Sequence, residues 1–353
     1  MNFDELIKQQ AAWLRGNGAD NDVVISSRVR LARNVTGFPF AARATCADFK
    51  SVVAAVTAAA DEVLPQGEFE TLDMGALLPD DAALLHERQL VSSDFIKLDC
   101  PRALILQKNE ELSVMVNEED HLRMQTTANG FVLNKLWERI NAFDNLLESK
   151  LDYAFDDQFG YLTACPSNVG TGMRASVLLH LPGLIETGEL AKVLRSLAMI
   201  NVEVRGVYGE GSRPLGECFQ ISNQTTLGLS EEAIVGQLAT IVESVLKYER
   251  EARQVVLKRD RDGLLDRCYR ALALLQSARI LTLEEAMGRL SSIRLGVHLK
   301  LFKSIPITLV NELLVHIQPS HLKRVANSQG GEVRDEAALR AEYLRERLAA
   351  IAK

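Results

Sequence analysis

One short stretch of the chain carries a high density of charge directly after an apolar run. Val114–Val116 is apolar, and the seven residues that follow hold five ionisable side chains: Glu118, Glu119, Asp120, His121 and Arg123. A solvated turn at the end of a strand would explain this composition. A site that binds a cation on one side and an anion on the other would explain it as well, because such sites gather both signs of charge.

Two arginines near the N-terminus have the spacing that places side chains on one face of a strand. Arg28 and Arg30 are two residues apart, and Val29 and Leu31 alternate with them. In an extended segment the two guanidinium groups would share one face. Each guanidinium can bond two oxygens at once, so the pair suits a polyphosphate. An exposed edge strand with solvated charge is the alternative.

Two glycine-rich loops have the composition to complete such a site. Residues 165–174, CPSNVGTGMR, begin with Cys165 and end with Arg174. Glycines permit close backbone approach to a ligand, and Asn and Thr form local hydrogen bonds. Residues 205–212, RGVYGEGS, add one arginine and one acid to a segment that could act as a mobile lid. A tight turn and an ordinary hairpin loop are the respective alternatives.

The elements that would position these residues alternate between strands and helices in the first two-thirds of the chain. Pairs of short apolar runs flank turn sequences within residues 103–116 and 151–164, which predicts two β-hairpins. Hairpins imply antiparallel pairing, so the sequence predicts an α+β fold with an antiparallel sheet flanked by helices. After Ser230, a good helix N-cap, nearly all of the signal is helical. We expect one domain over residues 1–250 and a smaller all-helical domain over residues 251–353.

Composition and short motifs argue against several classes of protein. The net charge of −7 argues against a generic nucleic-acid binder. No apolar run approaches the roughly 20 residues that cross a bilayer, and the N-terminus has acids and no apolar core, unlike a signal peptide. The five cysteines lack a C-x-x-C pair, which fits reduced thiols in the cytoplasm rather than disulfides or a zinc site. Walker A, H-E-x-x-H, kinase H-R-D and G-x-S-x-G sequences are absent.

Taken together and in order, these stretches resemble the phosphagen (guanidino) kinase family. The matching blocks are VISSRVRLARN, NEEDHLR, CPSNVGTGMRASV and VRGVYGEG, between about residues 23 and 230. WLRGNG near the N-terminus and RLGVHLKLF near the C-terminus are similar to the bacterial protein-arginine kinase branch of that family. The resemblance implies the phosphagen kinase catalytic fold, followed by a helical domain that serves in dimerisation and in binding phosphoarginine.

The resemblance also implies that MgATP donates its γ-phosphoryl group to a guanidinium nitrogen. Such transfer depends mainly on positioning and charge neutralisation. The implied phosphate-binding residues are Arg28, Arg30, Arg123, Arg174 and Arg205. The implied catalytic residues are Glu119 as base and orienter, Glu210 as a second clamp on the guanidinium, and Cys165 beside it. Glu118 would act in the outer shell of Mg²⁺, with no metal permanently bound, and the loop would be supported by Asn168, Gly170 and Thr171.

The C-terminal helix departs from the pattern of the protein-arginine kinase branch. In that branch an R-D-x-x-R-A sequence belongs to an allosteric phosphoarginine site. The nearest residues here are Arg334, Asp335 and Arg340, with two extra residues between the pairs. An allosteric site and a solvated amphipathic helix are equally compatible with this segment.

The identity of the acceptor follows from a second departure. Small-molecule phosphagen kinases carry a helical domain of about a hundred residues before the matching region, whereas about twenty residues precede Val23 here. We therefore expect an open acceptor pocket and protein substrates with exposed arginine. A kinase of free arginine or another small guanidine is the alternative enzyme, and a non-catalytic phosphoarginine-binding adaptor is the alternative of another class. The resemblance further suggests a homodimer, a zinc-binding activator protein and a Clp-type protease as partners.

Overall fold

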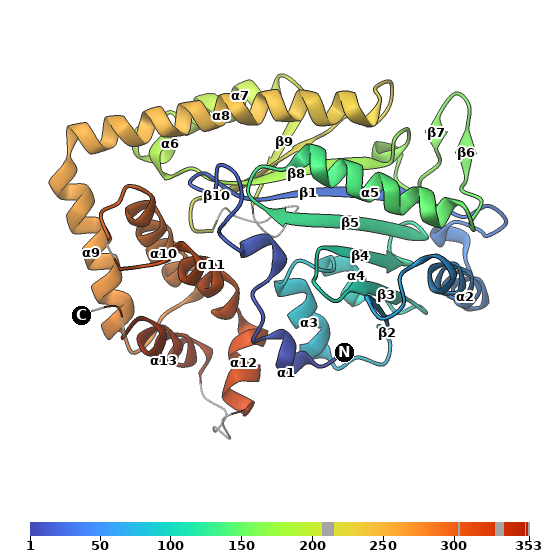
Figure 1. Ribbon diagram of the computed structural model, residues 1–353, viewed down its shortest axis with the longest axis horizontal. Helices are drawn as coiled ribbons and strands as arrows, with labels where there is room; N and C mark the ends of the chain where they lie inside the picture. Colours follow the sequence, from blue (N-terminus) through green and yellow to red (C-terminus); the bar gives the residue numbers. More distant parts are fainter. Residues whose placement is uncertain (207–214, 303, 329–334, 350, 352–353) are drawn as a thin grey trace.

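An eight-stranded antiparallel sheet forms the centre of the protein (Figure 1). The computed structural model describes residues 1–206, 215–302, 304–328, 335–349 and 351. Within them the strands lie in the order β2-β3-β4-β5-β1-β8-β10-β9, and all neighbours are antiparallel. The bounds are β1 Val24–Arg33, β2 Phe69–Asp73, β3 Ala103–Gln107, β4 Leu112–Val116, β5 Leu122–Asn129, β8 Met173–His180, β9 Val202–Arg205 and β10 Cys218–Asn223. The predicted α+β class is confirmed.

Both predicted hairpins are present. Strands β3 and β4 pair with each other in the main sheet. The second hairpin pairs β6 (Phe155–Asp156) with β7 (Gly160–Tyr161), and it is shorter than the apolar runs suggested. The guanidinium carbon of Arg33 lies 3.5 Å from the centre of the Tyr161 ring. This cation–π contact fastens the hairpin to the end of β1.

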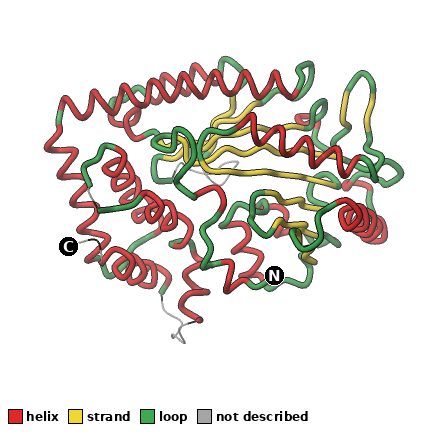
Figure 2. Tube along the Cα trace, viewed as in Figure 1, coloured by secondary structure: helices red, strands yellow, loops and turns green. Residues whose placement is uncertain are grey.

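Three long helices cover one face of the sheet: α2 (Cys46–Val63), α5 (Leu133–Glu148) and α8 (Glu231–Arg259) (Figure 2). A reciprocal capping box between Thr45 and Asp48 starts α2. The hydroxyl of Ser230 accepts a hydrogen bond from a backbone N–H and starts α8, as predicted. Apolar residues of the three helices and the inward residues of the strands form the largest buried cluster.

The opposite face of the sheet has two parts. Over β2, β3 and β4 it is covered by the helices α1 (Phe3–Leu6), α3 (Pro79–Glu87) and α4 (Ser93–Lys97). There Leu104 and Met115 are buried against the helices, while the next residues along the strands, Ile105 and Val114, belong to the first cluster. Over β5, β1, β8 and β10 this face carries polar side chains such as Gln125, Ser176, Gln220 and Ser222.

The C-terminal part of the chain is helical, as predicted. Its helices are α9 Arg261–Ser277, α10 Leu283–His298, α11 Ile307–His316, α12 Pro319–Ser328 and α13 Glu336–Ala349. They enclose a second buried cluster, which also takes in Trp13 and Leu14 from the N-terminal segment. Two shorter helices, α6 (Pro182–Glu186) and α7 (Leu190–Ala198), lie beside α8, and their buried residues Leu184 and Leu197 belong to the first cluster. Among the described helices, each is too short or too polar to cross a bilayer.

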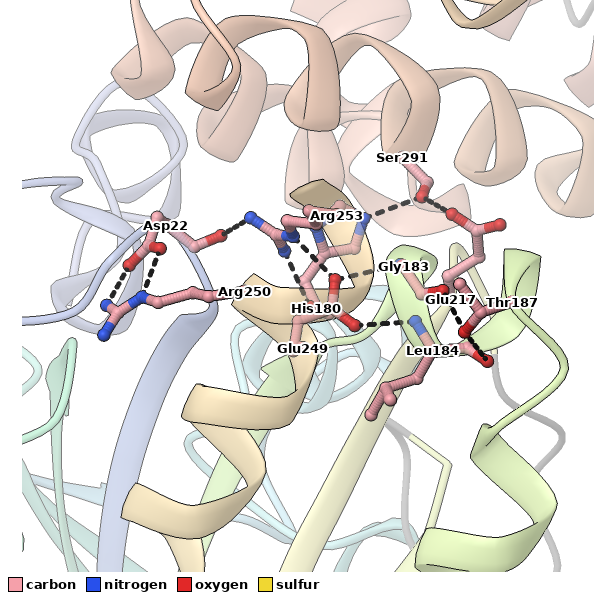
Figure 3. A network of polar contacts seen from close by, with 10 residues as sticks. All are labelled: Asp22, His180, Gly183, Leu184, Thr187, Glu217, Glu249, Arg250, Arg253 and Ser291. Carbon is pink, nitrogen blue, oxygen red and sulfur yellow. Dashed lines mark hydrogen bonds and ion pairs between the residues drawn. The ribbon is translucent and has the colours of Figure 1, made fainter. Parts of the chain in front are cut away.

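A polar network joins the helical part to the sheet beneath α8 (Figure 3). Arg253 of α8 donates to the backbone oxygens of Asp22 and His180, at 2.9 and 3.0 Å. The imidazole of His180 lies 2.7 Å from the hydroxyl of Ser291 in α10, which in turn donates to Glu217 just before β10. Because Arg253, His180 and Ser291 are buried and hydrogen-bonded across these elements, the network fixes the two parts of the chain against each other.

Candidate active site

The register of the sheet brings all five predicted phosphate-binding arginines to one face. Directly paired residues on neighbouring strands point to the same side. Arg30 of β1 is opposite Arg174 of β8, and its neighbour Ala32 is opposite Arg123 of β5. Arg28 lies on the same side as Arg30 by strand alternation, and Arg205 of β9 follows through β10. All five arginines line one cavity of about 600 Å³.

The arginine cluster has an excess of positive charge. Arg28 and Arg30 touch the cavity, but their guanidinium groups are deeply surrounded by protein. Burial, together with the charges of Arg123 and Arg174, lowers the pKa of Arg28 to about 10. The same causes lower the pKa of Arg30, and the Nε atom of Arg30 is buried with no hydrogen-bond partner among the described residues. Such a cluster is poised to receive an anion.

Two acids balance part of this charge. Glu118 accepts a hydrogen bond from the hydroxyl of Ser92 at 2.6 Å and forms an ion pair with Arg123. Burial alone would raise the pKa of Glu118, but Arg123 and the hydrogen bonds lower it. Glu203 of β9 forms ion pairs with Arg174 and Arg205. Glu118 lies in the cavity where a phosphate-bound cation would approach, and its role toward Mg²⁺ stays a prediction.

Glu119 and Cys165 lie together in the wall of the same cavity. The thiol of Cys165 lies near enough to the Glu119 carboxylate to lower its pKa, and the thiol sulfur lies 3.0 Å from the hydroxyl of Ser167. Partial burial raises the pKa of Glu119, and the neighbouring charges of Asp120 and Glu118 raise it further. A carboxylate with a raised pKa is a better general base. Glu210, the second predicted clamp, lies outside the described residues.

The loop from Cys165 to Gly172 divides into a cavity-lining part and a supporting part. Asn168 lines the cavity at the end of a short 3-10 helix. Gly170 has a φ of +111°, and a Cβ there would lie 2.3 Å from the carbonyl oxygen of Thr226. The backbone N–H of Thr171 donates to that same oxygen at 2.9 Å. These positions fit the predicted supporting role, because only glycine allows the two segments to approach so closely.

The residues proposed for a phosphoarginine site are differently placed. Arg334 lies outside the described residues, and Asp335 is exposed just before α13. Arg340 is 1% exposed, and its guanidinium donates to the backbone oxygens of Ile317 and Leu281, at 2.9 and 3.0 Å. The described contacts give Arg340 a structural role as a cross-link between helices. Binding of phosphoarginine at these three residues stays a prediction.

Sequence reasoning missed several polar residues that shape the site. Gln220 of β10 accepts a hydrogen bond from Arg28 at 2.7 Å, and Ser92 holds Glu118. Glu203 sits two residues before Arg205, a spacing that signals a shared face once the strand is known. The only sequence signal at Ser92 is that of a helix N-cap, which it is for α4, and such a signal does not indicate a role in the site.

Comparisons with known proteins agree with this geometry. Residues 51–252 match the family described as "ATP:guanido phosphotransferase, C-terminal catalytic domain", and residues 261–353 match "Protein-arginine kinase McsB C-terminal domain". The chain is 44% identical over 322 residues to a protein-arginine kinase of Pelotomaculum thermopropionicum, which covers 90% of each chain. It is 40% identical over 354 residues to a protein-arginine kinase of Symbiobacterium thermophilum, covering 99% of this chain and 100% of that one.

Two solved structures share the fold over more than two-thirds of this chain. The duplicated taurocyamine kinase from Schistosoma mansoni, in complex with components of a transition-state analogue, has a TM-score of 0.61 at 25% identity. That match covers 69% of this chain and 35% of the duplicated chain, so this chain spans about a third of it. A lombricine kinase has a TM-score of 0.60 at 23% identity, covering 68% of this chain and 70% of that one. The match to the lombricine kinase supports similarity of the fold alone.

Proposed function

Because the chain belongs to the protein-arginine kinases of the ATP:guanido phosphotransferase family, we propose that it transfers the γ-phosphoryl group of ATP to arginine side chains of proteins. The observation that carries the proposal is one cavity with two chemically distinct parts. Five arginines occupy one part, and the neighbouring side chains of Glu119 and Cys165 occupy the other. The reaction joins an anion to a cation, and this cavity holds binding groups for both.

The arginine face would bind the triphosphate. Guanidinium groups bond phosphate oxygens bidentately and are always charged near neutral pH. The unbonded Nε of Arg30 and the lowered pKa values of Arg28 and Arg30 support this assignment, because a bound polyanion would satisfy both. Fixed arginines here would take the part that a P-loop takes in other nucleotide-binding proteins.

Glu119 would orient the acceptor guanidinium and accept its proton. A guanidinium is a poor nucleophile while it is fully protonated. As the nitrogen attacks, one N–H proton passes to the Glu119 carboxylate, the N–P bond forms, and the bond from the γ-phosphorus to the bridging oxygen breaks. The leaving group is ADP. The thiol of Cys165, in contact with Glu119, would lie beside the same guanidinium.

A magnesium ion would supply charge neutralisation between the phosphate oxygens. Among the described residues, no group of three or more His, Cys, Asp or Glu side chains is arranged to hold a metal ion. The residues present therefore fit an ion that is bound mainly by phosphate and water. Glu118, one of the acids in the cavity wall, is the residue we assign to its outer shell.

The proposal is tested by incubating the protein with MgATP and either a basic unfolded protein or free arginine, and then measuring acid-labile phosphate. Label on the protein substrate alone is the expected result. Label on free arginine alone would assign the chain to the small-guanidine kinases. Label on neither acceptor would favour a phosphoarginine-binding adaptor.

Further proposals concern the location and the partners of the protein, and those on partners rest on family resemblance. We propose that the chain acts in the cytoplasm, which is consistent with its five unpaired cysteines. We propose that it forms a homodimer through residues 251–353, works with a zinc-binding activator protein, and marks proteins for a Clp-type protease. The expected boundary between the two domains, at residue 250, falls within helix α8, which runs without a break to Arg259.

A further inference from the structure

The turn between β4 and β5 contains a buried carboxylate that the transfer step does not use directly. Asp120 is 2% exposed, although its neighbour Glu119 is exposed. Its Oδ1 atom accepts hydrogen bonds from the backbone N–H of Ala164 and from Nδ2 of Asn34, both at 2.6 Å. Ala164 directly precedes Cys165 in the chain. This single oxygen therefore joins the turn that carries Glu119 to the loop that carries the thiol.

We propose that Asp120 is a positioning residue for phosphoryl transfer, which holds Ala164 so that the Cys165 thiol lies against Glu119. The inference rests on the acceptor site proposed above. The carbonyl of Cys165 is fixed in turn by the hydroxyl of Thr163, at 2.8 Å. The backbone on both sides of Cys165 is thus tied down, which fixes the position of its Cα atom relative to the turn that carries Glu119.

Asn34 and His121 hold the other side of this arrangement. The side-chain oxygen of Asn34 accepts the backbone N–H of His121 at 2.9 Å, while its nitrogen binds Asp120. The Nδ1 atom of His121 accepts the backbone N–H of Val35 at 3.0 Å, so its Nε2 donates to the carbonyl oxygen of Pro39 at 3.1 Å. Burial lowers the pKa of His121. His121 is therefore a neutral structural residue rather than an acid or base in the reaction.

The charge of Asp120 also acts on Glu119. The charged and titratable groups that face Glu119 are Asp120 and Glu118 from its own turn, Arg123 from β5 and Cys165 from the opposite loop. Partial burial raises the pKa of Glu119 most, and the charge of Asp120 is the next cause. Asp120 thus has two separable effects: its hydrogen bonds place the thiol, and its charge makes Glu119 more basic.

Two variants of the full-length protein separate these effects. Asp120→Asn keeps an oxygen for Ala164 and Asn34 but removes the charge, so it should retain most transfer activity. The acid limb of its pH–rate profile should move to lower pH by about half a unit. Asp120→Ala removes the hydrogen bonds as well, and transfer to a basic protein substrate should fall by about a hundredfold. Thermal stabilisation by MgATP should be unchanged in both variants.

A second measurement is independent of transfer. The rate of Cys165 alkylation by iodoacetamide, followed by mass spectrometry of the peptide, reports directly on the surroundings of the thiol. The rate should change severalfold in Asp120→Ala and stay near the wild-type value in Asp120→Asn. Cys46 is exposed and serves as an internal control. Glu249→Gln is the matched control, because Glu249 is also a buried carboxylate that accepts two backbone N–H groups, but outside the cavity.

Each outcome decides a different point. Equal Cys165 alkylation rates in wild type and Asp120→Ala would overturn the positioning role. An acid limb that is identical in Asp120→Asn and wild type would overturn the effect of its charge. A shift of either readout in Glu249→Gln would show a general response to loss of a buried carboxylate and would also overturn the inference. If the wild-type protein transfers phosphate to no acceptor, the proposed function fails, while the alkylation rates still test the position of the thiol.

Discussion

Replacing Arg30 with methionine should make the protein more stable without nucleotide and should abolish its stabilisation by ATP. Arg30 lies directly opposite Arg174, and Arg28 and Arg123 act on it from the same face. Glu118 is the acid that opposes this repulsion. Methionine fills a similar volume and removes both the charge and the buried unbonded Nε. The expected sign is therefore the reverse of that for most substitutions at half-buried sites.

The magnitude follows from the geometry of the sheet. Two unit charges about 7 Å apart interact with about 2 kcal/mol at an effective dielectric constant of about 20. Three like-charged neighbours exceed the attraction of one acid, and salt screening reduces the difference. We expect Arg30→Met to raise the free energy of unfolding by about 1–2 kcal/mol. ATP at a hundredfold excess over its Kd should stabilise the wild type by about 2.7 kcal/mol and should leave the variant unchanged.

The assay is urea and thermal unfolding with and without MgATP, and Arg33→Met is the control on the same strand. Arg33 is also a buried arginine, but it is paired with Asp144 at 2.7 Å and donates to two backbone carbonyls. Breaking that pair leaves a buried carboxylate alone and should cost about 3–5 kcal/mol. If Arg30→Met is destabilised as Arg33→Met is, or if it still gains stability from ATP, Arg30 is structural and the assignment of this face is refuted.

Three other outcomes follow from the same geometry. Glu119→Gln and Glu210→Gln should keep stabilisation by ATP and lose transfer by about 10²–10⁴-fold; near-normal turnover in both would contradict the clamp on the guanidinium. Arg174→Lys should weaken ATP affinity and slow transfer, since an ammonium cannot reproduce a bidentate fork; unchanged titration and turnover would count against its role. Burial lowers the pKa of His321 to about 4, against the pull of Glu87. Because unfolded histidine protonates near 6.5, the contribution of His321 to the free energy of unfolding should fall by about 1.4 kcal/mol per pH unit as the pH drops from about 6.5 to 4. His321→Asn should flatten that dependence in urea titrations, and an unchanged slope would exclude His321 as its source.

The elements with a regular pattern of apolar and polar residues were predictable from the sequence. The two hairpins, the helix after Ser230 and the C-terminal helices all follow from period and capping signals in the sequence. Strand β5, Leu122–Asn129, carries no such signal, because its buried residues include Gln125 and Thr127 on one face and Met124 and Thr126 on the other. A strand that is buried on both faces and polar on one has no alternation of apolar and solvated residues to detect. Helix α5, by contrast, has apolar residues at helical spacing, and its sequence carries a detectable helical signal.

The part of the cavity that holds Glu119 and Cys165 was less predictable from the sequence than the arginine face. The reason is physical. Once a strand is assigned, alternation predicts which face of the sheet each of its arginines occupies. A turn has no such regular pattern, so its sequence does not predict which residues its side chains contact. Asp120 looked like part of a solvated turn, and only its contact with Ala164, more than forty residues away, gives it a role. Ser92 and Gln220 likewise act through partners that are distant in sequence.

The same alternation that builds the core also builds the arginine face, so stability and binding are specified together. Along β1, Val29 and Leu31 are fully buried beneath the helices while Arg28 and Arg30 face the cavity. A shift of the register by one residue would turn every side chain of the strand to the other face. It would place guanidinium groups in an apolar core, at a cost of several kcal/mol for each unpaired charge. Repulsion among the arginines is therefore the smaller cost, because the shifted register would bury the same charges in the apolar core. Under the proposed function, a bound triphosphate would offset that repulsion.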